Sequence, residues 1–124
     1  MMTVKTKTLG EKGEDIAAAF LEKKGYHILF RNYKCSFGEI DIIAKHKKTL
    51  SFIEVKTRST KKYGLPQEAV TSVKQAKISR VALEFVQRYK MDNRTARFDV
   101  VSVQSLNDGY EVDLIENAFE LTVD

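Results

Sequence analysis

The segment Leu50–Lys56, LSFIEVK, gives the clearest indication of both fold and chemistry in this chain. A short run rich in aromatic and β-branched residues predicts a β-strand. Side chains alternate across a strand, so Glu54 and Lys56 are expected on one face, beside Phe52. A carboxylate and an ammonium on one strand face indicate either an exposed ion pair, which contributes about 1 kcal/mol or less, or a functional site.

A second strand, predicted over Glu39–Lys45, supplies another acid. If the chain turns at residues 47–48, Asp41 lies opposite Glu54, whereas a slip of one residue would turn Asp41 to the other face. Directly opposed Cβ atoms lie roughly 4.5 to 5.5 Å apart, so the two carboxylates repel each other unless a cation neutralises them. Lys56 would do this in part. Mg²⁺ would do it better, because it prefers carboxylate oxygens and retains water ligands.

The residues around these charges decide between the two interpretations. They are mainly apolar: Ile40, Ile42, Ile43, Phe52, Ile53 and Val55. Such neighbours predict a buried strand pair, in which an ionised group needs a partner or a function. Asp41, Glu54 and Lys56 are therefore interpreted as the core of a metal-dependent site.

The remaining periodicities predict a mixed α/β sandwich, in which a central sheet is flanked by helices. Apolar residues at helical spacing predict one helix over Leu9–Lys24, which stops at Gly25, and a second helix after Pro66. The predicted strands are Tyr26–Tyr33, Glu39–Lys45, Leu50–Arg58, Arg97–Val103 and Tyr110–Ile115, the last two joined by an Asp-Gly turn. The element order is α-β-β-β-α-β-β, in one domain over residues 1–124 with its core at about 9–103.

Two polar residues on the predicted helices have alternative interpretations. Glu14 lies at the rim of the apolar stripe of the first helix, where it either reaches a metal ion or a lysine, or is a solvated acid favoured by the helix dipole. Gln75 lies on the apolar line of the second helix. It either reaches a ligand over the sheet or forms a capping box with Ser72, and the pattern favours the capping box.

The composition indicates the class of partner. The formal net charge of +4 and the sequence pI of about 9.1 favour an anionic partner without identifying one. The basic residues that follow the predicted third strand are candidates for a phosphate-binding rim: Arg58, Lys61, Lys62, Lys74 and Lys77. The single cysteine, Cys35, and the lack of an apolar leader or membrane span predict a soluble, cytoplasmic protein that is not bound to a membrane.

Four blocks of the sequence stand in a distinctive order: Gly10–Glu14 (GEKGE), Gly38–Ala44 (GEIDIIA), Phe52–Arg58 (FIEVKTR) and Arg97–Val101 (RFDVV). From about Leu9 to Val103 they resemble the YraN-like family of uncharacterised bacterial proteins, in the PD-(D/E)xK nuclease superfamily. That family is similar to the archaeal Holliday-junction resolvases, so the resemblance implies a restriction-endonuclease-like fold. Ile40 stands where the superfamily's name has proline, a common variation that leaves the metal ligands intact.

The resemblance also implies roles for individual residues. Asp41 and Glu54 would hold Mg²⁺, with Mn²⁺ as a substitute, and Lys56 would position the attacking water and stabilise developing charge. Glu14 would be an accessory acid. Gln75 matches the glutamine found on a helix near such sites.

The expected function is therefore that of a metal-dependent endonuclease that hydrolyses phosphodiester bonds in DNA, with branched or junction DNA as a candidate substrate. The alternative is a nucleic-acid-binding module that uses the nuclease scaffold without cutting, and a third hypothesis is an interaction subunit with no nucleic-acid role. The complete set of acids and lysine favours the nuclease. A homodimer would present two sites to the two strands of a junction.

Overall fold

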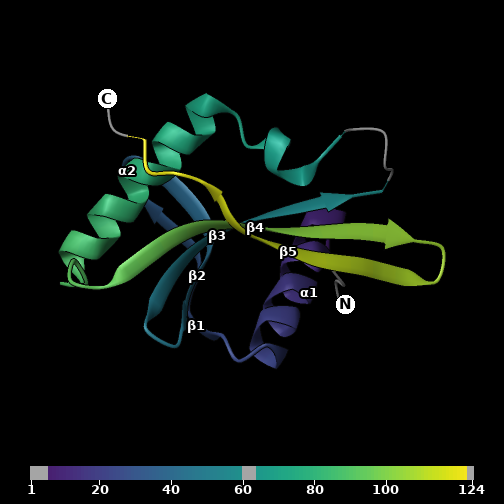
Figure 1. The fold of residues 1–124 in the computed structure, drawn as a ribbon. Helices are drawn as coiled ribbons and strands as arrows, with labels where there is room; N and C mark the ends of the chain where they lie inside the picture. Colours follow the sequence, from purple (N-terminus) through teal and green to yellow (C-terminus); the bar gives the residue numbers. More distant parts are fainter. Residues whose placement is uncertain (1–5, 60–63, 123–124) are drawn as a thin grey trace, which may run out of the picture.

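The protein folds as a five-stranded sheet with one long helix on each face (Figure 1). The computed structural model describes residues 6–59 and 64–122. The elements are α1 (Leu9–Lys23), β1 (His27–Cys35), β2 (Gly38–His46), β3 (Thr49–Arg58), the 3₁₀ helix η1 (Pro66–Ala69), α2 (Ser72–Arg88), β4 (Thr95–Leu106) and β5 (Gly109–Phe119). The predicted order α-β-β-β-α-β-β is confirmed, and η1 is an addition to it.

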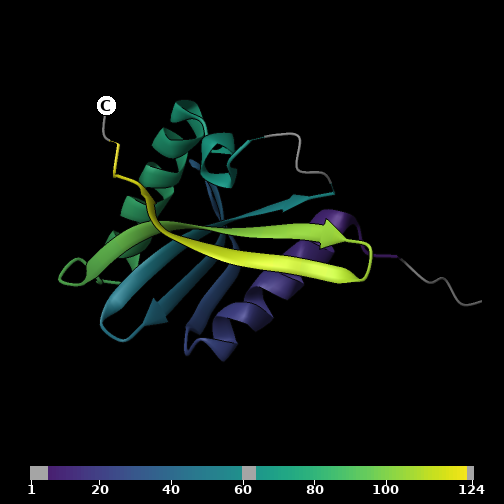
Figure 2. The same cartoon turned by 45° about the vertical axis from the view of Figure 1, so that its right-hand side comes forward.

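The sheet is mixed because α2 connects two of its neighbouring strands. The strands lie in the order β1-β2-β3-β4-β5, and all neighbours are antiparallel except β3 and β4. Parallel neighbours need a crossover, which η1 and α2 provide on one face while α1 covers the other (Figure 2). Within residues 6–59 and 64–122, no helix has the length and apolarity needed to cross a membrane.

α1 begins and ends close to the predicted boundaries. The Thr8 hydroxyl accepts a hydrogen bond from Glu11 N (3.1 Å), and the Glu11 side chain accepts one from Thr8 N (3.4 Å). This reciprocal capping box satisfies amides that the first turn leaves free. The chain leaves the helix at Gly25, which has a φ of 90°, a conformation that glycine adopts at little cost.

The start of α2 differs from the predicted capping box. The N-cap is Thr71, whose hydroxyl accepts a hydrogen bond from Lys74 N (3.3 Å), and Ser72 is already the first helical residue. The Gln75 side chain donates from Nε2 to Val70 O at 2.9 Å. The capping box between Ser72 and Gln75 is therefore wrong. Thr71 and Ser72 are both good N-caps, so the sequence alone does not select between them.

β2 and β3 pair in the predicted register. Ile42 lies opposite Ile53 and His46 lies opposite Thr49, so the turn falls at residues 47–48. This register depends on the turn position, because a slip by one residue would move every side chain to the other face.

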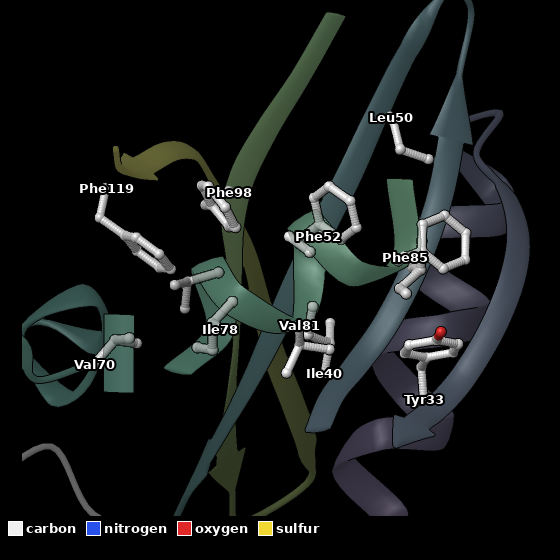
Figure 3. Packing of buried hydrophobic residues seen from close by; sticks show 13 residues of the cluster. Tyr33, Ile40, Leu50, Phe52, Val70, Ile78, Val81, Phe85, Phe98 and Phe119 are labelled. Atoms are coloured by element: carbon white, nitrogen blue, oxygen red, sulfur yellow. The ribbon is translucent and has the colours of Figure 1, made fainter. Parts of the chain in front are cut away.

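An apolar cluster on each face of the sheet holds the three layers together. On the α2 face, Phe85 is fully buried, with its ring centroid 5.9 Å from that of Phe52 and 5.2 Å from that of Tyr33 (Figure 3). The Tyr33 hydroxyl donates to the Glu84 carboxylate at 2.6 Å. Tyr33 is thus a core residue.

A buried carboxylate ties β3, β4 and β5 together. Asp99 is fully buried, and it accepts hydrogen bonds from Arg97 Nε (2.9 Å), Asn117 N (2.8 Å) and the Ser51 hydroxyl. Asn117 has a φ of 53° and lies where the register of β4 and β5 shifts. These four residues, the Asp99 cluster, therefore fix an irregular edge strand to the centre of the sheet.

Candidate active site

A cleft of about 530 Å³ lies at the end of the sheet where β2 and β3 stop pairing. β2 begins at Gly38 and β3 continues to Arg58, but the ladder between them ends at the pair Ile42–Ile53. Both helices contribute to the lining of this cleft. Its charged residues are Glu14 from α1, Glu39 and Asp41 from β2, Glu54 and Lys56 from β3, and Lys74 and Lys77 from α2.

Asp41 and Glu54 meet where the ladder ends. They are the next residues outward from the pair Ile42–Ile53. The Asp41 carboxylate accepts a hydrogen bond from Val55 N at 2.8 Å and so satisfies an amide that has left the ladder. Glu54 is only 8% exposed, and Asp41 is half-buried. The structure thus brings together the two acids that the register predicts as neighbours.

Burial makes both acids hard to ionise. It raises the pKa of Glu54 from 4.5 to about 7, and the neighbouring charge of Asp41 adds to that rise. Burial also raises the pKa of Asp41, although the hydrogen bond from Val55 N opposes the rise. Two adjacent acids with raised pKa values need a proton or another cation between them at neutral pH.

Lys56 supplies one cation, from the same strand as Glu54. Its side chain is half-buried and lines the cleft. Burial lowers the pKa of Lys56, and the adjacent ammonium of Lys74 lowers it further. β3 remains paired with β4 as far as Arg58, so Lys56 projects from a fixed backbone.

Glu14 reaches the same cleft from α1. Its Oε1 atom is buried and has no hydrogen-bond partner within the described part of the chain. Burial raises the pKa of Glu14, and the charge of Asp41 adds to the rise. A buried carboxylate oxygen without a partner costs free energy unless a proton or a metal ion meets it. Of the two interpretations of Glu14, these contacts favour a residue of the site over a solvated acid.

A close contact between α1 and β3 brings Glu14 into position. The preceding residue, Gly13, is buried, and a Cβ atom there would lie 1.9 Å from Thr57 Oγ1. Glycine therefore allows α1 to approach β3 more closely than any larger residue would. Sequence reasoning missed Gly13, because a single glycine within a helical pattern does not reveal which strand the helix will touch.

The donor atoms in the cleft suit a hard divalent cation. Among residues 6–59 and 64–122, no group of three or more His, Cys, Asp and Glu side chains lies in a position to surround one metal ion. Asp41 and Glu54 offer carboxylate oxygens, and Mg²⁺ is typically held by one or two carboxylates while it retains several waters. His46 instead stacks on Tyr26, with ring centroids 4.2 Å apart. The residues present therefore fit Mg²⁺ and do not resemble a zinc centre.

From α2, the side chains that reach the cleft are Lys74 and Lys77 and not Gln75. The Gln75 amide is bound to Val70 O at 2.9 Å. Neighbouring positions on a helix point about 100° apart, since a turn takes 3.6 residues, so a small rotation of α2 decides which one faces the cleft. The pattern of apolar residues could not resolve that rotation.

The structure describes three of the five residues of the predicted basic rim, Arg58, Lys74 and Lys77. Arg58 Nη1 donates to Gly64 O at 2.5 Å, so this guanidinium is bound to the backbone carbonyl of Gly64. Lys61 and Lys62 lie outside the described residues. Among the described residues of the rim, Lys74 and Lys77 line the cleft.

Known proteins resemble this chain along most of its length. The uncharacterised protein family UPF0102 matches residues 13–103. A UPF0102 protein of Syntrophus aciditrophicus is 52% identical over 112 residues, which cover 90% of this chain and 88% of the relative. One from Geobacter sulfurreducens is 51% identical over 116 residues, which cover 93% and 91%. Among solved structures, Pyrococcus furiosus SfsA in complex with Ca²⁺ is similar at a TM-score of 0.40 and 12% identity, over 86% of this chain and 61% of that one.

Proposed function

The chain belongs to the uncharacterised protein family UPF0102, the YraN-like family that its sequence blocks resemble, and we propose that it is a metal-dependent endonuclease acting on DNA. The observation that carries this proposal is the meeting of Asp41, Glu54 and Lys56 in one cleft. Acids whose pKa values are raised by burial, beside a lysine in an open cleft, are expected of a hydrolytic site.

In this proposal Asp41 and Glu54 hold a divalent cation, which is Mg²⁺ or, as a substitute, Mn²⁺. With a pKa of about 7, Glu54 carries a proton in roughly half of the molecules at neutral pH, and it would have to be deprotonated to hold the cation. Bound there, the cation would lower the pKa of a water molecule and offset charge on the scissile phosphate. Glu14 would act as an accessory acid, because its buried Oε1 has no hydrogen-bond partner among the described residues.

Lys56 orients the attacking water and stabilises the negative charge that develops on the phosphate. A fixed cation in a partly buried cleft stabilises such charge more effectively than a solvated one, because no solvent has to reorient during the reaction. The half-buried position of Lys56 and the pairing of β3 with β4 support this role. The hydrolysis requires no covalent intermediate with the protein.

The charge distribution favours a nucleic acid as the substrate, and DNA is the form that we propose. The chain has a net charge of +4, and Lys74 and Lys77 line the cleft beside the acids. Phosphate contacts from such lysines position a nucleic acid without reading its sequence. Branched DNA is the first substrate to test, and a homodimer would present two clefts to the two strands of a four-way junction.

The proposal is tested by incubating the purified protein with labelled single-stranded, duplex, flap and four-way-junction DNA in EDTA, Mg²⁺ or Mn²⁺. We expect cleavage that requires the metal ion and is lost in Glu54→Ala and Asp41→Ala. Glu22→Ala, which removes an exposed acid of α1, serves as the matched control and should cleave normally.

Normal cleavage by Glu54→Ala would contradict the assignment of the site. Binding to junction DNA without cleavage, with the same affinity in EDTA and in Mg²⁺, would favour the binding module on a nuclease scaffold instead. Such binding would weaken steeply with salt and would depend on the lysines more than on Glu54.

A further inference from the structure

Lys74 enters the cleft from the first turn of α2. Its backbone N–H is held by the N-cap Thr71, and its side chain lines the cleft together with Asp41, Glu54 and Lys56. α2 lies on one face of the sheet and α1 on the other. Lys74 therefore approaches the reactive groups from the side opposite to Glu14.

The stability of the fold does not explain a lysine at this position. The start of a helix carries a partial positive charge, so a cation in the first turn is unfavourable. The first turn of α2 contains no acidic residue to offset it. Across the described ranges, Lys74 forms no ion pair within 4.0 Å of a carboxylate.

Lys74 also lies next to another cation. Burial lowers the pKa of the half-buried Lys56, and the Lys74 ammonium lowers it further, while Lys74 also opposes the rise in the pKa values of Asp41 and Glu54. Two adjacent ammonium groups in a partly buried cleft repel each other unless an anion lies between them. Once a divalent cation neutralises Asp41 and Glu54, a phosphate group of bound DNA is an anion that fits between the two lysines.

We propose that Lys74 is a second catalytic lysine, which binds the same scissile phosphate as Lys56. This inference rests on the proposed endonuclease function and adds a residue to it. Lys56 approaches the phosphate from the sheet and Lys74 from the helix, so the charge that develops on the phosphate oxygens is shared between two cations. The N-terminal end of α2 adds its partial positive charge on the same side.

Lys77 provides the matched comparison. It lies one turn further along α2, is exposed like Lys74 and lines the same cleft. It is not among the main influences on the pKa values of Asp41, Glu54 or Lys56. Lys77 is therefore expected to contact a flanking phosphate and to act in binding.

Single-turnover cleavage at saturating DNA separates the two lysines. We expect Lys74→Met to lower the rate constant about 100-fold with little change in affinity, as for the loss of one donor to developing charge, and Lys74→Arg to recover part of it. Lys77→Met should weaken binding a few-fold and change the rate constant less than about 3-fold. A loss of affinity alone in Lys74→Met would overturn the proposal.

A second measurement does not depend on cleavage. The side-chain ammonium signals of ¹⁵N-lysine-labelled protein are followed by NMR as a short duplex oligonucleotide is added in Ca²⁺, with assignments from the Met variants. We expect the Lys56 and Lys74 signals to shift together, and the signal of Lys48, in the distant β2–β3 turn, to stay in place.

The two measurements distinguish the failure of this inference from the failure of the proposed function. Shifts at Lys74 without cleavage of any DNA would support the phosphate contact while removing the nuclease. Cleavage with an unshifted Lys74 signal at saturating oligonucleotide would overturn the contact and leave the nuclease standing. If no lysine signal moves and no DNA is cleaved, both proposals fail.

Discussion

The Asp99 cluster within the sheet and the acids of the cleft at its end differ in how completely the fold supplies their hydrogen-bond partners. In the Asp99 cluster, a fully buried carboxylate receives hydrogen bonds from Arg97, Ser51 and the backbone of Asn117. These donors come from β3, β4 and the bulged part of β5. Asp99 is therefore a structural acid, whose partners are all supplied by the chain itself.

The acids of the cleft are held differently. Asp41 receives a hydrogen bond from Val55 N, whereas Glu54 has a pKa raised to about 7 and Glu14 has a buried oxygen with no partner in the described ranges. Burial alone thus does not mark a functional acid, since Asp99 is the more buried of the two kinds. What distinguishes the cleft is that, within the described part of the chain, its acids lack the full set of hydrogen-bond donors that Asp99 receives.

The largest effect on stability is expected when the charge of Asp99 is removed, which tests whether Asp99 is a structural acid. Asp99→Asn places an amide group against donors that now point at a carboxylate, and leaves the Arg97 guanidinium without its buried partner. We expect a loss of about 3 to 5 kcal/mol in the free energy of unfolding, the usual cost of breaking a buried ion pair. Urea denaturation at neutral pH measures it, with the exposed Asp113→Asn on β5 as the control. A loss below about 1 kcal/mol would mean that the cluster is not structural.

The same kind of substitution in the cleft should have the opposite sign. The pKa of Glu54 is higher in the folded protein than in the unfolded chain, so ionisation of Glu54 destabilises the fold. The stability contributed by the protonated side chain is fully present below about pH 4.5 and is lost as the pH rises through about 7. Glu54→Gln mimics the protonated acid, so at pH 8 it should be more stable than the parent by about 3 kcal/mol, and the gain should vanish toward pH 4.

Denaturation of the parent and of Glu54→Gln across this pH range tests that sign. Glu22→Gln, on the exposed face of α1, should show no such dependence. If Glu54→Gln is less stable than the parent at pH 8, Glu54 is a structural acid like Asp99, and the contrast between the two groups disappears.

A divalent cation should reduce the repulsion between the buried acids of the cleft without affecting the Asp99 cluster. A ligand that binds only the folded state adds about 1.4 kcal/mol to the free energy of unfolding when its concentration is ten times its dissociation constant. The Tm of the parent should therefore rise with Mg²⁺. Glu54→Gln and Asp41→Asn should lose this rise, and Asp113→Asn should keep it. An equal rise in all variants would place the cation elsewhere on the surface. Thermal unfolding followed by circular dichroism in EDTA and in Mg²⁺ makes the measurement.

Local patterns predicted one of the two groups and not the other. The turn at residues 47–48 fixes the β2–β3 register, so the meeting of Asp41 and Glu54 follows from sequence. The partners of Asp99 come from three strands, one of them through the parallel pairing of β3 with β4, and no local pattern specifies such contacts. The choice of Lys74 over Gln75 depends likewise on the orientation of α2, which tertiary packing sets.

The contact between Gly13 and Thr57 is a non-local feature on which the cleft itself depends. Gly13→Ala would bring a Cβ atom within 1.9 Å of Thr57 Oγ1, so α1 must move away from β3. Overpacking costs about 1 to 3 kcal/mol, and alanine returns about 1 kcal/mol as the better helix former, so we expect a net loss of about 1 kcal/mol. The displacement should also withdraw Glu14 from the cleft and lower the rate of DNA cleavage.

A double-mutant cycle with Thr57→Ala tests this dependence, because removal of Oγ1 makes room for the new methyl group. The two changes should then be non-additive, and Thr57→Ala should recover part of the stability and of the cleavage that Gly13→Ala loses. Additive losses would mean that α1 accommodates the methyl group without moving Glu14. Recovery would show that Gly13, although it has no side chain to act in the reaction, controls how closely α1 brings Glu14 to the cleft.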